Sequence, residues 1–276
     1  MLENIFNDME KKDRTKEIQS FVKLLDIMDE LREKCPWDRK QTIDSMRPMT
    51  IEETFELSDA IIRGDMKNIS KELGDVLLHI VFYSKIASET GQFDICDVMD
   101  QLCNKLVYRH PHVFGEKQVK DAEEVVKNWE QLKRTEKDGN KTVLSGVPDS
   151  MPSTIKALRM QEKASAVGFD WSKKEEVWDK VSEEIAEFHV ELKKDLGKKE
   201  NKALAEGELG DLMFSVINAA RLYDLDPDTA LEMTNKKFRN RFGYVEAKAK
   251  ERGIALKGMS LQEMDALWNE AKESGL

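Results

Sequence analysis

Two clusters of carboxylates built from the same two motifs are the residues of this sequence best suited to chemistry. Each cluster combines a Glu-Glu-x-x-Glu motif with a later Glu-Leu-Gly-Asp motif. Residues three or four positions apart share one face of a helix, so two antiparallel helices would bring four carboxylates together. Like charges in a partly dry setting repel one another unless a cation or protons neutralise them. The expected metal ligands are Glu53, Glu56, Glu72 and Asp75 in the first copy and Glu184, Glu187, Glu208 and Asp211 in the second.

The expected metal is Mg²⁺, with Mn²⁺ as a possible substitute, because sites made only of oxygen ligands select hard cations. Solvated helix faces offer a competing explanation, since 36% of the residues are charged and such chains produce many Glu pairs. The duplication and the apolar neighbours of both Glu pairs favour an inward-facing site instead.

A second set of residues, suited to binding a nucleotide, follows each acidic cluster in the same order. Each copy has a Lys and an Arg four positions apart, and then a Trp and a Lys four positions apart. Such cations suit phosphate oxygens, and an indole face can stack on a base. Surface salt bridges and a core tryptophan are the alternatives. The expected nucleotide-binding residues are Lys105, Arg109, Trp129 and Lys133 in the first copy and Lys180, Lys237, Arg241, Trp268 and Lys272 in the second.

Further motifs make a family resemblance specific. The sequence resembles the tandem-domain MazG nucleoside triphosphate pyrophosphohydrolases of the all-α NTP pyrophosphatase superfamily, from about Phe21 to Trp268. Besides the acidic clusters, the matching segments are Cys35-Pro36-Trp37-Asp38 with Gln41-Thr42, Arg109-His110-Pro111-His112-Val113-Phe114 and Val167-Gly168-Phe169-Asp170-Trp171. The resemblance implies an all-α fold of two tandem MazG-like helical bundles and a homodimer. It also implies Mg²⁺-dependent cleavage of nucleoside triphosphates to the monophosphate and pyrophosphate.

Within that reaction, a metal on the second cluster would activate a water for in-line attack. Lys237 and Arg241 are counted among the catalytic groups, and Glu183, beside the ligands, is a candidate base. Broad acceptance of NTPs and dNTPs in a nucleotide-pool house-cleaning role is the expected function. The alternative is a non-catalytic nucleotide-sensing or protein-binding helical module with a structural metal site. The second repeat is favoured as the active one because Lys180, Lys236 and Arg239 are additional cations near its presumed phosphate path.

The composition limits the partners and the location. A net charge of −10 and a pI near 5.2 argue against nucleic-acid binding, which needs a basic surface. Three cysteines form no even framework, which favours a reducing compartment. The start lacks signal-peptide features and no apolar run reaches membrane-spanning length, so a cytoplasmic protein without a membrane partner is expected.

The pattern of apolar residues is helical almost throughout. It predicts an N-terminal repeat over residues 1–138, a linker over 139–150 and a C-terminal repeat over 151–276. The lysine-rich stretch Lys193 to Glu206 is interpreted as a connection that either lines a phosphate entrance or is a solvated loop. Asp38 and Asp170 either shape the nucleotide end of the site or cap the helices that follow them.

Overall fold

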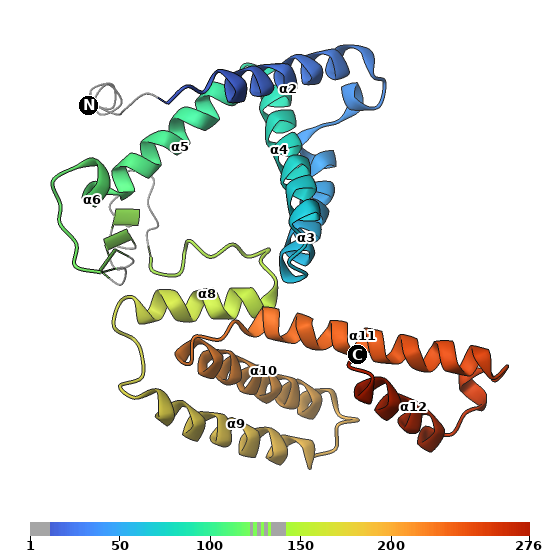
Figure 1. Ribbon diagram of the computed structural model, residues 1–276. Helices are drawn as coiled ribbons and strands as arrows, with labels where there is room; N and C mark the ends of the chain where they lie inside the picture. Colours follow the sequence, from blue (N-terminus) through green and yellow to red (C-terminus); the bar gives the residue numbers. More distant parts are fainter. Residues whose placement is uncertain (1–11, 122–123, 126–127, 130–131, 134–141) are drawn as a thin grey trace. The chain divides into compact units, whose positions relative to one another are not determined.

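The structure is a computed structural model that describes residues 12–121, 124–125, 128–129, 132–133 and 142–276. Helices joined by turns make up these residues, and no strand occurs among them, which confirms the predicted all-α fold (Figure 1). The chain divides into two compact units, unit 1 (Met1–Lys133) and unit 2 (Arg134–Leu276). Residues 139–141 of the predicted linker lie outside the described residues, and residues 142–150 form turns and bends.

Unit 1 is built around a pair of helices joined by a three-residue turn. The pair is α3 (Ile43–Ile62) and α4 (Met66–Ser88), which pack side by side (Figure 1). The other elements are α2 (Thr15–Lys34), η1 (Asp38–Lys40), α5 (Ile95–Arg109) and α6 (Pro111–Phe114). Thr42 and Ser45 form a capping box at the start of α3, and the side chain of Asp65 accepts from the Asn68 N–H at the start of α4. These caps set the two helices that carry the first acidic cluster.

Unit 2 contains a corresponding pair of helices. Its pair is α9 (Val177–Leu192) and α10 (Lys199–Leu222), and α8 (Ser153–Ser165) packs against α10. The chain continues through α11 (Pro227–Glu251), η3 (Leu256–Gly258) and α12 (Leu261–Glu273), with η2 (Lys174–Glu176) preceding α9. Two small cores result, because α9 packs on α10 and α11 packs on α12.

The lysine-rich stretch before the second Glu-Leu-Gly-Asp motif is not one long connection. Helix α10 begins at Lys199, so much of this stretch is helical and only residues 193–198 join α9 to α10. Lys, Glu and Ala are strong helix formers, and no proline interrupts them here. Residues 199–206 therefore extend the helix that carries Glu208 and Asp211.

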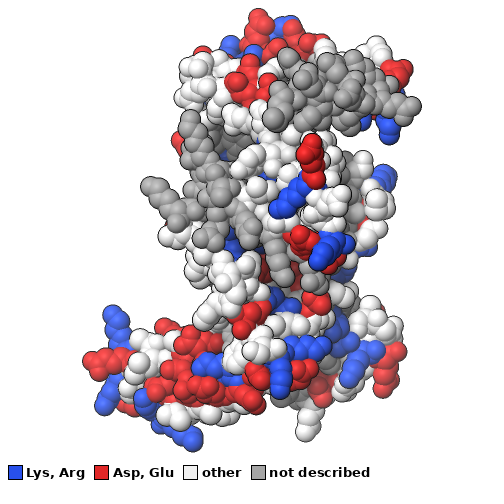
Figure 2. Space-filling view, turned by 90° about the vertical axis from the view of Figure 1, so that its left-hand side faces the viewer, with Lys and Arg blue, Asp and Glu red and all other residues white. Residues whose placement is uncertain are grey.

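The surface is mixed in charge. On the face displayed in Figure 2, acidic and basic side chains are interspersed rather than gathered into one basic stripe. Among the described residues, no helix has both the length and the apolar character needed to cross a membrane.

Candidate active site

The first acidic cluster lies between α3 and α4. Carboxylate oxygens of Glu53, Glu56 and Glu72 lie within 4.8 Å of one another. Glu72 is only 5% exposed, and its Oε2 atom is buried without a hydrogen-bond partner. Partial desolvation and then the charge of Asp75 raise the pKa of Glu53, with further contributions from Glu56 and Glu72. Three of the four carboxylates predicted from the first repeat therefore converge, and Asp75 lies close enough to act electrostatically on Glu53.

The second cluster lies between α9 and α10. Carboxylate oxygens of Glu184, Glu208 and Asp211 lie within 4.8 Å of one another, and Glu184 is buried. Partial desolvation raises the pKa of Glu208, followed by the charges of Glu187, Asp211 and Glu184. Glu187 thus lies close enough to act electrostatically on the cluster. Glu191, which the sequence analysis did not select, contributes to the same rise.

Each cluster contains one lysine, but the two lysines come from different helices. In unit 1, Lys71 Nζ on α4 lies 2.9 Å from Glu72 Oε1 and 3.6 Å from Asp75 Oδ2. In unit 2, Lys180 Nζ on α9 lies 2.7 Å from Glu184 Oε1 and 3.0 Å from Glu183 Oε1. These carboxylates raise the pKa of both ammonium groups, chiefly through hydrogen bonds. Both lysines are therefore held as cations.

The donor set of both clusters fits a hard divalent cation. All the converging groups are carboxylates, and a single lysine does not neutralise four of them. The buried Glu72 Oε2 without a partner is an acceptor that a cation would satisfy. Glu183 differs from the predicted ligands beside it, because its side chain is exposed and is bound by Lys180.

The predicted phosphate-gripping residues of unit 2 gather on α11 and α12. Lys237, Arg241 and Lys272 line a hollow of about 380 Å³ next to the C-terminal Leu276. The Arg241 guanidinium lies 5.7 Å from the centre of the Trp268 ring, and Arg241 Nε donates to the Leu276 carbonyl at 2.7 Å. Trp268 packs against the core shared by α11 and α12.

Unit 1 forms the same arrangement of cation and indole. The Arg109 guanidinium lies 5.9 Å and the Lys133 ammonium 5.7 Å from the centre of the Trp129 ring. His110 packs edge-on against the same ring at 4.7 Å. Lys105 lies on α5 one turn before Arg109. The structure thus places Arg109 and Lys133 beside Trp129 and Arg241 beside Trp268, whereas the predicted cation Lys180 lies at the second acidic cluster.

A larger hollow adjoins the second acidic cluster. It has a volume of about 740 Å³ and is lined by α8, the loop over residues 166–173, η2, α9 and α10, with Leu144. Lys180, Glu184 and Asp211 belong to its wall, whereas Lys237, Arg241 and Trp268 do not. Four polar residues of this wall, Gln161 on α8 and Ser215, Asn218 and Arg221 on α10, were not selected from the sequence. Their polarity gave no signal until packing placed them around one cavity.

The far wall of this pocket is held by an ion pair. Arg221 Nη1 and Nη2 donate to the two carboxylate oxygens of Asp170 at 3.0 and 2.5 Å. Desolvation of Asp170 works to raise its pKa, but the hydrogen bonds from Arg221 and Ser165 outweigh it and lower the pKa below its ordinary value. Asp170 does not cap the element that follows it, because Lys173 is the N-cap residue of η2. Asp38 does not cap a helix either, because Trp37 is the N-cap residue of η1 and no side chain closes that end.

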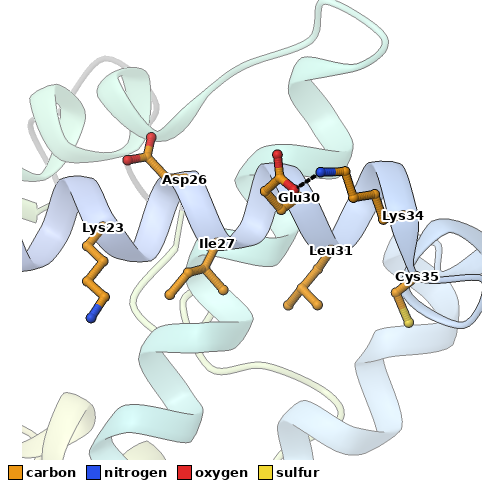
Figure 3. Close-up of a pocket in the computed structure, with 7 residues that line it drawn as sticks. All are labelled: Lys23, Asp26, Ile27, Glu30, Leu31, Lys34 and Cys35. Atoms are coloured by element: carbon orange, nitrogen blue, oxygen red, sulfur yellow. Dashed lines mark hydrogen bonds and ion pairs between the residues drawn. The ribbon is translucent and has the colours of Figure 1, made fainter.

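A further hollow, of about 490 Å³, runs along α2 in unit 1 and is mainly apolar. Figure 3 shows Ile27, Leu31 and Cys35 on one side of the helix, while Glu30 points elsewhere and pairs with Lys34. None of the acidic-cluster residues lines it.

The comparisons with known proteins agree with this geometry. The profile of the MazG nucleotide pyrophosphohydrolase domain matches residues 41–114, which span α3 to α6. A nucleoside triphosphate pyrophosphohydrolase of Escherichia coli K12 is 38% identical over 91% of this chain and 96% of its own length. The nucleoside triphosphate pyrophosphohydrolase/pyrophosphatase MazG of Thermotoga maritima is 40% identical over 91% of this chain and 95% of its own. The uncharacterized protein YabN of Bacillus subtilis is 44% identical over 87% of this chain and 48% of its own. The chain therefore belongs to the MazG family of nucleotide pyrophosphohydrolases.

Proposed function

We propose that this enzyme hydrolyses nucleoside triphosphates to the monophosphate and pyrophosphate in a Mg²⁺-dependent reaction. The observation that carries the proposal is the convergence of carboxylates from α9 and α10 on the edge of a pocket large enough for a small molecule. The names of its relatives in Escherichia coli and Thermotoga maritima support the same reaction. We further propose broad acceptance of NTPs and dNTPs, as in a cytoplasmic house-cleaning enzyme.

The residues that would hold the metal in unit 2 are Glu184, Glu187, Glu208 and Asp211. A bound divalent cation supplies charge withdrawal from the phosphoryl group and a more acidic water. Glu183 is exposed beside these residues, where its carboxylate can accept a proton from the attacking water once Lys180 releases it. Lys180 is held as a cation at the pocket wall, where it can bind a phosphate oxygen.

The basic hollow on α11 and α12 would bind the outer phosphates. Lys237, Arg241 and Lys272 offer one guanidinium and two ammonium groups around it, and the Trp268 ring fixes the Arg241 guanidinium from one side. Lys105, Arg109, Trp129 and Lys133 are the corresponding proposal for unit 1. Stacking of a base on Trp268 or Trp129 stays a prediction.

We also propose that the protein is a homodimer. The α10 helix exposes Leu209, Met213 and Val216, and a side chain added at Gly210 would meet open space. Apolar faces of this kind mark interaction surfaces when they are contiguous along a helix. Sedimentation at micromolar protein should give about twice the chain mass of 31.8 kDa. A monomer with full activity would contradict the dimer.

A substrate panel tests the reaction. The protein is incubated with each NTP and dNTP in Mg²⁺, Mn²⁺ or EDTA, and the monophosphate and pyrophosphate are quantified. With Mg²⁺ we expect equal molar amounts of the monophosphate and pyrophosphate. With EDTA we expect neither product. Nucleotide binding without any product would favour the alternative, a non-catalytic nucleotide-sensing or protein-binding module with a structural metal.

A further inference from the structure

The pocket beside the second acidic cluster contains a buried hydrogen-bond acceptor with no partner. Gln161 on α8 is 7% exposed and lines this pocket. Its Nε2 donates to the Phe214 carbonyl on α10 at 2.8 Å, while its Oε1 is buried and accepts no hydrogen bond. Buried polar atoms are normally satisfied, and those that are not call for an explanation.

The orientation of the Gln161 amide is fixed by its neighbour. If oxygen and nitrogen were exchanged, two acceptors, the amide oxygen and the Phe214 carbonyl, would face each other. The atom of this amide that is left without a partner is therefore the oxygen, which can only accept a hydrogen bond. A ligand that satisfies it must bring an N–H or O–H into the pocket.

The donors on the far wall of the pocket are already engaged. The Arg221 guanidinium binds both oxygens of Asp170, and its Nε donates to Asn218 Oδ1 at 3.0 Å. These contacts anchor Asp170 and therefore the loop that carries Phe169 and Trp171. Phe169 is 83% exposed although it lines the pocket, so one aromatic ring is available to cover a planar ligand.

We propose that this pocket is the nucleobase subsite of unit 2, and that Gln161 Oε1 accepts a hydrogen bond from an N–H on the base. This inference rests on the proposed function, because a metal held by Glu184 and Asp211 in one part of the wall would place the phosphates there and leave the rest of the pocket to the base. The volume of about 740 Å³ lies within the range of roughly 300–1,000 Å³ typical of small-molecule sites. Small-molecule sites are commonly lined by apolar and aromatic side chains, with a few polar groups that fix the orientation of the ligand.

The test pairs each nucleotide with an analogue that lacks one base N–H donor. Purine riboside triphosphate replaces ATP, 2-pyrimidinone riboside triphosphate replaces CTP, N3-methyluridine triphosphate replaces UTP and N1-methylguanosine triphosphate replaces GTP. The kcat/KM values are measured for the wild-type protein and for Gln161→Met, which keeps the side-chain length and removes the amide. Gln262→Met is the matched control, because Gln262 is exposed on α12.

At least one analogue should lower the wild-type kcat/KM by about tenfold or more, since a buried acceptor left unpaired disfavours the bound state. Gln161→Met should reduce that difference to less than about threefold, while Gln262→Met should retain it. If no pair is discriminated, or if discrimination persists in Gln161→Met, the assignment is overturned. Gln161→Leu replaces Gln161→Met if circular dichroism shows that the methionine variant is unfolded.

Binding measurements separate this inference from the proposed function. Dissociation constants of the α,β-methylene forms of the same nucleotide pairs are measured by calorimetry. Discrimination that depends on Gln161, without hydrolysis of any NTP, would keep the base subsite and reject the reaction. Hydrolysis without any dependence on Gln161 would keep the reaction and reject the subsite.

Discussion

The two units share their acidic clusters but differ in the wall beside them. Counted from the Leu-Gly-Asp motif, His79 on α4 corresponds to Ser215 on α10, and Phe82 corresponds to Asn218. His79 and Phe82 are 5% and 2% exposed, and Phe82 packs in the core of unit 1. Ser215 and Asn218 line the large pocket of unit 2 instead. Side-chain volume at these positions thus fills the space in one repeat and leaves it open in the other.

The lysines of the clusters have also changed helices. The position of Lys71 on α4 is occupied by Gly207 on α10, and the position of Lys180 on α9 is occupied by Met49 on α3. Each repeat has therefore kept one cation among its carboxylates by a different route. The comparison teaches that both repeats place a lysine among their carboxylates, whereas two of the residues that line the large pocket in unit 2 are replaced by bulkier buried side chains in unit 1. We therefore propose that unit 2 carries catalysis.

The largest expected effect comes from removing one carboxylate of the unit 2 cluster, compared with the same change in unit 1. Glu187→Gln should lower kcat by about 100-fold or more, because a neutral amide weakens the hold on a divalent cation. Asp211→Asn should behave in the same way, and the fold should persist since one negative charge fewer relieves repulsion. Glu56→Gln in unit 1 should change kcat by less than about threefold. Pyrophosphate release at saturating nucleotide measures all three variants, and equal losses from Glu56→Gln and Glu187→Gln would remove the distinction between the units.

Exchanging the wall residues gives the next largest effect. Asn218→Phe places the unit 1 side chain in the unit 2 pocket, so it should raise KM at least tenfold by occupying the space of the base. Phe82→Ala in unit 1 should instead destabilise the protein by about 3–5 kcal/mol, because a buried aromatic ring is lost from a core. Its kcat per folded molecule should stay near the wild-type value. Steady-state kinetics and chemical denaturation separate the two outcomes, and an unchanged KM in folded Asn218→Phe would contradict the pocket assignment.

A pair of aromatic substitutions then compares the pocket loop with the last helix. Phe169→Ala should raise KM for all NTPs by about tenfold with little change in kcat. The reason is that stacking of an aromatic ring on a base contributes roughly 1–3 kcal/mol to binding, whichever base it is. Trp268→Ala should act first on stability, since Trp268 packs in the core of α11 and α12. A tenfold rise of KM in Trp268→Ala at unchanged stability would instead place the base on Trp268, as the sequence analysis expected.

The smallest expected effect concerns acid stability. Arg221 in unit 2 and Arg32 in unit 1 each bind a carboxylate through two nitrogens, on Asp170 and Glu89 respectively. These hydrogen bonds lower the pKa of both carboxyl groups below their ordinary values of 3.8 and 4.5, against the opposing effect of burial. The stabilisation is therefore complete above the ordinary values and is lost as the pH falls through the lower folded-state values.

Asp170→Asn should remove the unit 2 contribution to this acid sensitivity. At pH 7 the variant should lose on the order of 1–2 kcal/mol of unfolding free energy, and the loss should shrink toward pH 2. Urea denaturation at several pH values measures the difference, with Glu89→Gln as the unit 1 counterpart. A loss from Asp170→Asn that does not vary with pH would contradict the role of the ionised pair.

Much of the site could be predicted from the sequence because it depends on local spacing. Glu53 with Glu56, and Glu208 with Asp211, share a helix face through the three-residue interval, and a short turn brings the paired helix back alongside. The pocket could not be predicted in this way. Gln161 becomes a free acceptor only because α8 packs on α10, and such tertiary contacts leave no periodic pattern in the sequence. The contacts of Lys180 differ in kind, because its partners Glu183 and Glu184 follow it by three and four positions on the same helix.

The lysine held within each cluster has a consequence for the order of events. Lys71 and Lys180 act as counter-ions that neutralise part of the negative charge of each cluster. A divalent cation held by these carboxylates would compete with the ammonium group for them, and the lysine would then be available to an incoming anion. Metal and triphosphate should therefore bind cooperatively. The metal would neutralise the carboxylates, and the triphosphate would neutralise the lysine that the carboxylates no longer hold.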